Sequence, residues 1–209
     1  MKTAAGQEDA APTAVIRARA LFLDDSHPYG CAETTFIALK EAFGLPDAAD
    51  ASPAMALNGG VAWSGGSCGA ITGAALAVGG LTASRTPDHA AAKGIAREVV
   101  AGLIDGFEAE FGALDCRALL GRDIRTPEAH AAFIESGTWR TACLRQIEFA
   151  VARLAGLAGD ARLGAPAGDL RPAGDLRPAT GPGSAPLGGG GQEEDDGTQQ
   201  RHDAAREDE

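Results

Sequence analysis

The sequence has 209 residues and a formal net charge of −11, from 18 Lys and Arg against 29 Asp and Glu. An acidic chain without a basic cluster repels a phosphate backbone, so we expect no nucleic-acid partner. Residues 1–13 lack the apolar run of a secretory signal, which favours a cytoplasmic location where thiols stay reduced. Four cysteines in that compartment indicate catalysis, metal binding or burial rather than structural disulfides.

Composition divides the chain into three segments. Residues 1–12 are expected to be a disordered N-terminus, and residues 13–159 contain the large apolar residues of a folded domain. Residues 160–209 are rich in Gly, Pro and acidic side chains and contain the hexapeptide GDLRPA twice in tandem. Such a segment buries too little apolar surface to offset its ordering entropy, so we expect a disordered C-terminal tail.

The first half of the domain predicts three helices. Apolar residues gather on one side over 14–23 and again over 31–43, which Gly44 terminates. A third helix is expected over about 68–78, inside the uncharged stretch 51–84. Because this helix is much shorter than the roughly 20 apolar residues that cross a bilayer, we predict a buried central helix and no membrane span.

The second half predicts further helices. One is expected over 86–112, with Pro87 at its first position and apolar residues recurring every four residues. A short helix is expected after residue 115, another over 126–137, and a last one from about residue 138. No period-two alternation predicts a strand. The fold class is therefore all-α, a compact bundle of about six to seven helices.

Each of the four cysteines lies near the start of a predicted helix. They are Cys31, Cys68, Cys116 and Cys143. Three of them follow plausible N-cap residues, namely Gly30, Ser67 and Asp115. A helix N-terminus carries a partial positive charge and free N–H groups, which lower the pKa of a thiol. The four thiols are thus candidate catalytic nucleophiles or metal ligands, although free cysteine is also a common inert core residue.

Glycines surround Cys68, with six of them in residues 58–73. Gly65 and Gly66 are predicted to form a nest of N–H groups around a sulfur anion or a small ligand. Ser67 is predicted to cap the next helix, and Gly69 allows close contact with a neighbour. We take these four residues as candidate cofactor-binding positions. Cys68 is then expected to be the most reactive thiol, with a pKa below the usual value of about 8.5.

The other polar and aromatic candidates carry a weaker signal. Asp24 and Asp25 are expected in a solvated loop, and His130 on the surface. Trp63 and Trp139 are expected to fill the core or to cover the site. The sequence has no Cys-x-x-Cys pair and no Cys-x-x-Cys-His segment, which excludes covalently attached haem.

Three segments carry a resemblance to a known family. They are residues 29–32 (YGCA), 67–74 (SCGAITGA) and 111–121 (FGALDCRALLG), followed by Cys143 at the start of the last helix. Over about residues 21–157 the chain resembles the C-GCAxxG-C-C family, with all four cysteines in order. The resemblance implies a small helical domain, a thiol site assembled from the four cysteines and a suspected redox role. It implies no particular substrate.

Three hypotheses of function remain open at this point. The first is thiol/disulfide or electron-transfer chemistry at the four-cysteine site, with an unidentified redox partner. The second is an iron–sulfur or other metal carrier with Cys31, Cys68, Cys116 and Cys143 as ligands. The third is a structural or interaction module with inert buried cysteines. The first two hypotheses require the four sulfurs to converge. The sequence does not determine whether the protein is an enzyme or which oligomer it forms, and a homodimer is one of the options.

Overall fold

The computed structural model describes residues 10–26, 29–160 and 163. These residues form seven α-helices and three 3₁₀ helices, and their only β pairing is an isolated bridge between Ser67 and Asp115. The all-α prediction is confirmed. The elements are α1 (Ala10–Phe22), α2 (Cys31–Phe43), η1 (Ser52–Leu57), α3 (Gly69–Arg85), α4 (His89–Phe111), α5 (Cys116–Leu120), α6 (Pro127–Glu135), η2 (Thr138–Arg140), α7 (Ala142–Leu154) and η3 (Ala155–Gly159).

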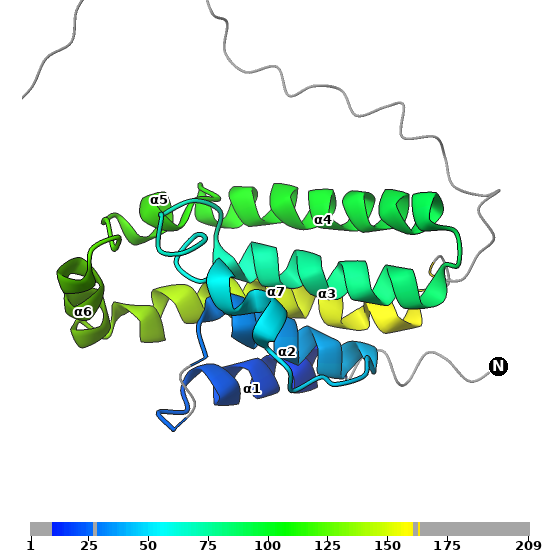
Figure 1. The fold of residues 1–209 in the computed structure, drawn as a ribbon, viewed down its shortest axis with the longest axis horizontal. Coiled ribbons are helices and arrows are strands. Elements are labelled where there is room, and N and C mark those ends of the chain that lie inside the picture. The colour runs from blue at the N-terminus through cyan, green and yellow to red at the C-terminus, as the bar shows by residue number, and fades with distance from the viewer. Residues whose placement is uncertain (1–9, 27–28, 161–162, 164–209) are drawn as a thin grey trace, which may run out of the picture. The chain divides into compact units, whose positions relative to one another are not determined.

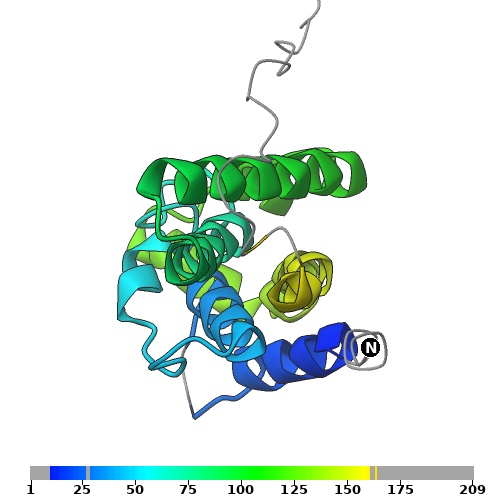
Figure 2. The ribbon, with the colours of Figure 1, turned by 90° about the vertical axis from the view of Figure 1, so that its right-hand side faces the viewer.

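Helix α3 lies at the centre of the helical domain. It packs against α2 on one side and α4 on the other, and α7 contacts α1, α2, α3 and α4 (Figures 1 and 2). The N-termini of α2, α3 and α7 lie at the same end of the bundle as α5 and α6, on the left in Figure 1. This common orientation brings several helix starts into one region.

The contact between α2 and α3 depends on small residues. A Cβ on Gly73 would collide with the carbonyl group of Ala32, so the two backbones approach more closely than other side chains allow. Val78 and Leu81 of α3 are fully buried together with several alanines of this helix, and Phe107 of α4 is also fully buried. The sequence prediction of a central buried helix over this segment is confirmed.

Two helix boundaries differ from the prediction. Helix α4 begins at His89 rather than at Thr86, because the Asp88 carboxylate accepts a hydrogen bond from the Ala91 N–H (2.7 Å) and caps the helix. Thr86 instead follows the last turn of α3, which extends to Arg85. In the described part of the chain, no helix is both long and apolar enough to cross a membrane.

The ends of the domain extend past the predicted limits. Helix α1 begins at Ala10, inside the segment 1–12 that was expected to be disordered. Leu163 lies beyond the expected boundary at residue 159, yet it is only 7 % exposed and packs on the core. Its N–H donates to the Asp160 carbonyl (3.1 Å). Almost all of the predicted tail lies outside the described residues.

Candidate functional site

Two helices begin at cysteines, as the sequence predicts. Cys31 is the first residue of α2 and follows the N-cap Gly30, and Cys116 is the first residue of α5 and follows the N-cap Asp115. Neither N-cap residue accepts a hydrogen bond with its side chain from an N–H group of the first turn.

The other two cysteines lie near helix starts in a different way. Cys68 is itself the N-cap of α3, so the prediction that Ser67 caps this helix is wrong. Ser67 pairs instead with Asp115 in the isolated bridge. Cys143 is the second residue of α7. All four thiols are therefore within one residue of a helix N-terminus.

The bridge holds two of these cysteines side by side. The N–H of Cys68 donates to the Leu114 carbonyl (2.8 Å), and the N–H of Cys116 donates to the Gly66 carbonyl (2.7 Å). The pairing joins the glycine-rich loop to the start of α5, although Cys68 and Cys116 are far apart in sequence. The backbone thus fixes the relative position of both residues.

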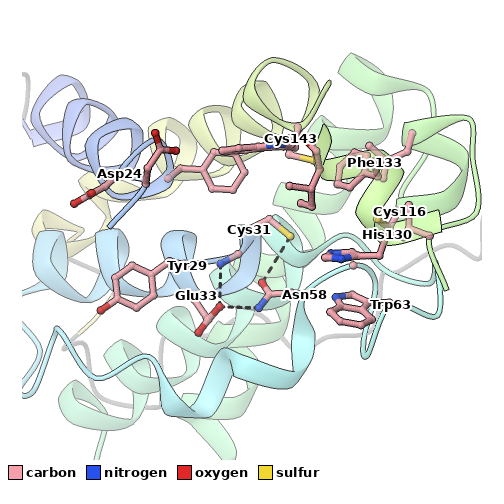
Figure 3. A pocket seen from close by; sticks show the side chains of 18 residues that line it. Asp24, Tyr29, Cys31, Glu33, Asn58, Trp63, Cys116, His130, Phe133 and Cys143 are labelled. Carbon is pink, nitrogen blue, oxygen red and sulfur yellow. Dashed lines mark hydrogen bonds between the residues drawn. The ribbon is translucent and has the colours of Figure 1, made fainter. Parts of the chain in front are cut away.

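Three of the thiols line one cavity of about 400 Å³ (Figure 3). They are Cys31, Cys116 and Cys143. Cys31 is half-buried, whereas the other cysteines, including Cys68 at 2 % exposure, are buried.

Electrostatic interactions join all four sulfurs. Burial is the main cause that raises each cysteine pKa, and it contributes to a pKa of about 12 for Cys116. A Cys31 thiolate further raises the pKa of each of the other three thiols. Such an influence weakens with distance, so the four sulfurs occupy one neighbourhood.

Backbone N–H groups gather around Cys31. Those of Gly59, Ala32, Cys31 and Gly69 favour its thiolate and lower its pKa, although burial outweighs them and leaves the pKa raised. Gly69 is required at this contact, since a Cβ there would collide with the Cys31 sulfur. These N–H groups are not those of the nest predicted from Gly65 and Gly66, and at Cys68 the N–H groups of Ala70 and Ile71 favour the thiolate.

Asn58 supplies a side-chain partner for Cys31. Its Oδ1 accepts hydrogen bonds from the Ala32 N–H (2.9 Å) and, weakly, from the Cys31 thiol (3.9 Å). Its Nδ2 donates to Glu33 Oε2 (2.7 Å), which also accepts from the Gly30 N–H (2.9 Å). A carboxylate only accepts, so Glu33 fixes the amide with its oxygen toward Cys31.

The sequence analysis missed both Asn58 and Glu33. A capping-box pattern, in which Glu33 lies three residues after Gly30, is a signal that could have identified the carboxylate. Nothing in the sequence indicates the partner of Cys68, which is Gln146 of α7. Such long-range pairs become visible only in the folded chain.

The prediction of a lowered pKa at Cys68 is wrong. Burial raises the pKa of this thiol, which donates to Gln146 Oε1 (3.4 Å) and is therefore held protonated. The N–H groups of Gly65 and Gly66 already donate to the carbonyls of residues 59 and 60 (3.1 Å each). Their proposed role in binding a cofactor therefore has no support from their hydrogen bonds.

A strained turn carries Trp63 to the cavity wall. Residues 59–63 all have positive φ, including the non-glycine residues Val61 (63°), Ala62 (50°) and Trp63 (59°). The Trp63 ring stacks on His130 with centroids 4.2 Å apart, and both line the cavity (Figure 3). Trp63 and Trp139 thus cover the site, one of the two predicted roles, whereas His130 is part of the wall rather than a free surface residue.

The described residues do not form a metal site. No group of three or more His, Cys, Asp or Glu side chains among them is arranged to hold a metal ion. The cysteines supply suitable sulfur donors, but their side chains do not adopt a ligand arrangement. The iron–sulfur and metal alternative therefore has no support from this geometry.

Fold and site together define a small all-helical protein with four clustered thiols beside one cavity. A family model described as "Putative redox-active protein (C_GCAxxG_C_C)" matches residues 29–157. The chain belongs to this family, and the resemblance seen in its cysteine motifs is confirmed. The comparisons found no match among curated proteins and none among solved structures.

Proposed function

We propose that the four-cysteine site carries out two-electron thiol/disulfide chemistry, with Cys31 as the attacking thiol. The observation that carries this proposal is the position of Cys31. As a residue it is less buried than the other three cysteines, it lines the cavity, and the N–H groups of Gly59, Ala32 and Gly69 favour its thiolate. Accessibility and thiolate formation are the two requirements for nucleophilic attack on a disulfide.

The reaction proceeds in two exchange steps. The Cys31 thiolate bonds to one sulfur of a substrate disulfide, whose S–S bond breaks and releases one thiolate. A second cysteine then attacks the Cys31 sulfur and releases the other half of the substrate. The protein ends with one disulfide, the substrate has accepted two electrons, and the two protons from the cysteines pass to the two product thiols.

Two cysteines are placed to resolve the intermediate. Cys116 and Cys143 share the cavity wall with Cys31, and the pKa of each responds to a Cys31 thiolate. Cys68 is less suited, because its thiol is buried and bonded to Gln146. An external dithiol must reduce the protein disulfide before the next cycle.

The test uses the reduced full chain and a neutral disulfide such as hydroxyethyl disulfide. We expect loss of two protein thiols per disulfide consumed, and peptide mass spectrometry should locate Cys31 in the new bond. Cys31→Ser should abolish consumption, whereas Cys68→Ser should retain it. Metal and sulfide analysis accompanies the assay on anaerobically purified protein.

Three outcomes would contradict the proposal. Equal consumption by the Cys31→Ser variant would exclude Cys31 as the attacking thiol. Stoichiometric metal or sulfide that protects the cysteines would favour the metal carrier instead. Cysteines that stay unreactive in metal-free, folded protein would favour the structural module.

A further inference from the structure

The wall of the cavity is mostly apolar, and aromatic rings form two groups on it. In the first group, Trp63 stacks on His130, and the ring centroids of His130 and Phe133 lie 6.5 Å apart. Figure 3 shows these three side chains together on one side of the cavity. In the second group, Phe22 and Trp139 meet edge to face, with their centroids 5.2 Å apart. Such a surface favours apolar and aromatic ligands.

The carboxylates of the described wall already have partners inside the protein. Asp25 forms an ion pair with Arg140 (2.7 Å), and Glu33 accepts a hydrogen bond from the Asn58 amide (2.7 Å). Asp24 accepts two hydrogen bonds from the residue two positions later (2.6 and 2.8 Å). A charged ligand must compete with these bonds or lose its hydration without a partner, so the wall favours an uncharged ligand.

Two large apolar side chains of the wall remain exposed to solvent. Trp63 is 40 % exposed and Ile134 is 46 % exposed, although both line the cavity. An apolar ligand would cover part of this surface, and the free energy gained grows with the area removed from water. The volume of about 400 Å³ falls in the range of small-molecule sites, roughly 300–1,000 Å³. Such a ligand would lie beside Cys31, Cys116 and Cys143, which line the same cavity.

We infer that the substrate of this site is a small uncharged organic disulfide with an apolar substituent. The inference rests on the proposed thiol/disulfide function and names its substrate class. The apolar substituent binds among the aromatic rings, and the Cys31 thiolate bonds to the nearer sulfur. The substrate S–S bond breaks, and the leaving thiolate takes up the proton that Cys31 has lost. Attack by Cys116 or Cys143 on the Cys31 sulfur then releases the second thiol, so two electrons pass from the protein to the substrate.

The test compares two uncharged methanethiosulfonates that differ in their apolar group, the methyl and the benzyl reagent. Each reacts with a thiolate to form a mixed disulfide and releases methanesulfinate. The rates at Cys31 in the reduced full chain, measured by peptide mass spectrometry, are divided by the rates with free 2-mercaptoethanol. We expect at least about a tenfold preference for the benzyl reagent, because its ring is buried against the aromatic wall.

A pair of variants locates the source of the preference. Ile134→Ser removes an exposed apolar side chain from the cavity wall and should lower the benzyl-to-methyl ratio at least about threefold. Ile16→Ser is the matched control, because Ile16 is an exposed isoleucine of α1 outside the cavity lining, and it should leave the ratio unchanged. Both side chains are exposed, so neither substitution opens a void in the core.

Competition with an unreactive aromatic molecule tests the same site without a substitution. Indole is uncharged and forms no bond with a thiolate, so it slows the reaction only by occupying the cavity. At about 1 mM indole, the benzyl reaction at Cys31 should slow at least about twofold, which corresponds to a dissociation constant of about 1 mM or less. The reaction with 2-mercaptoethanol should not change.

The outcomes separate this inference from the proposed function. If neither reagent modifies Cys31 in folded protein, the proposed function itself fails. If both reagents react and their normalised rates are equal, the thiol function stands and the substrate inference is overturned. A benzyl preference that indole leaves unchanged, or that Ile16→Ser lowers as much as Ile134→Ser, would also overturn the inference, since the benzyl group would then bind outside the cavity.

Discussion

The sulfur of Cys31 occupies the space that a side chain on Gly69 would fill. Cys31 begins α2 and Gly69 begins α3, so the two helix N-termini meet at one thiol. Each N-terminus carries a partial positive charge, and N–H groups of both residues act on the sulfur. The close packing of these helices and the placement of the thiol therefore depend on the same missing Cβ.

Gly69→Ala should disrupt both features. The added methyl group collides with the Cys31 sulfur and lies 3.0 Å from the Ala32 nitrogen, so we expect a loss of about 1–3 kcal/mol in unfolding free energy. Gly79→Ala is the matched control on the same helix. Its Cβ meets no atom within 4 Å and should stabilise the helix by about 0.5–1 kcal/mol. Denaturant unfolding measures both, and equal effects would contradict the packing argument.

Alkylation of Cys31 should speed up with pH through the neutral range. Burial holds the pKa of Cys31 above that of an ordinary cysteine thiol, and the thiolate is the reactive form. The rate should therefore rise about tenfold per pH unit from pH 7 to 8.5, with no plateau. Timed iodoacetamide labelling with peptide mass spectrometry gives the profile. Cys68 should label after Cys31, and a plateau below pH 8 would show that the pKa is lowered instead.

Asn58→Ala should lower the pKa of Cys31. The substitution removes an oxygen that accepts from the neutral thiol, and it admits water, so both changes favour the thiolate. It also frees the Ala32 N–H, at a cost of about 1–3 kcal/mol in stability. The pH profile of alkylation should shift to lower pH. An unchanged profile with reduced stability would assign Asn58 a purely structural role.

Ala62→Gly should stabilise the protein. Ala62 has a φ of 50°, a left-handed conformation that costs an L-residue about 1–2 kcal/mol, whereas glycine adopts it freely. Glycine also gives the unfolded chain more entropy, which cancels part of this gain. We therefore expect the free energy of unfolding to rise by about 1 kcal/mol overall. Ala56→Gly, in the helical η1 segment, should instead destabilise by about 0.5–1 kcal/mol. Thermal melting of the pair checks the opposite signs.

Two truncations should differ by the contribution of one leucine. Removal of residues 164–209 should change the melting temperature by no more than a few degrees, because that segment has little apolar surface. Removal of residues 160–209 also deletes the buried Leu163, which contributes about 1.5–3 kcal/mol. A large fall in melting temperature on removal of residues 164–209 alone would mean that the tail stabilises the domain.

Local sequence signals determined the helices and the starting points of the thiols. Helix α2 has the predicted limits, because Gly30 precedes it and Gly44 ends it. Thr126 and Pro127 begin α6 as predicted, and Gly112 ends α4. These features depend on residues within one or two turns, which a single sequence contains. The cysteine order and spacing likewise sufficed to indicate the family.

Tertiary structure alone decided how the pKa of each thiol is shifted. From the sequence, the glycines near Cys68 indicated a stabilised thiolate, but burial and the bond to Gln146 reverse the direction of its pKa shift. Desolvation depends on all the chain segments that surround a group, and Gln146 is 78 positions away. The same holds for Cys31, whose partners Asn58 and Gly69 come from other elements. Sequence thus places each thiol on its helix, whereas packing between helices sets its accessibility and its proton affinity.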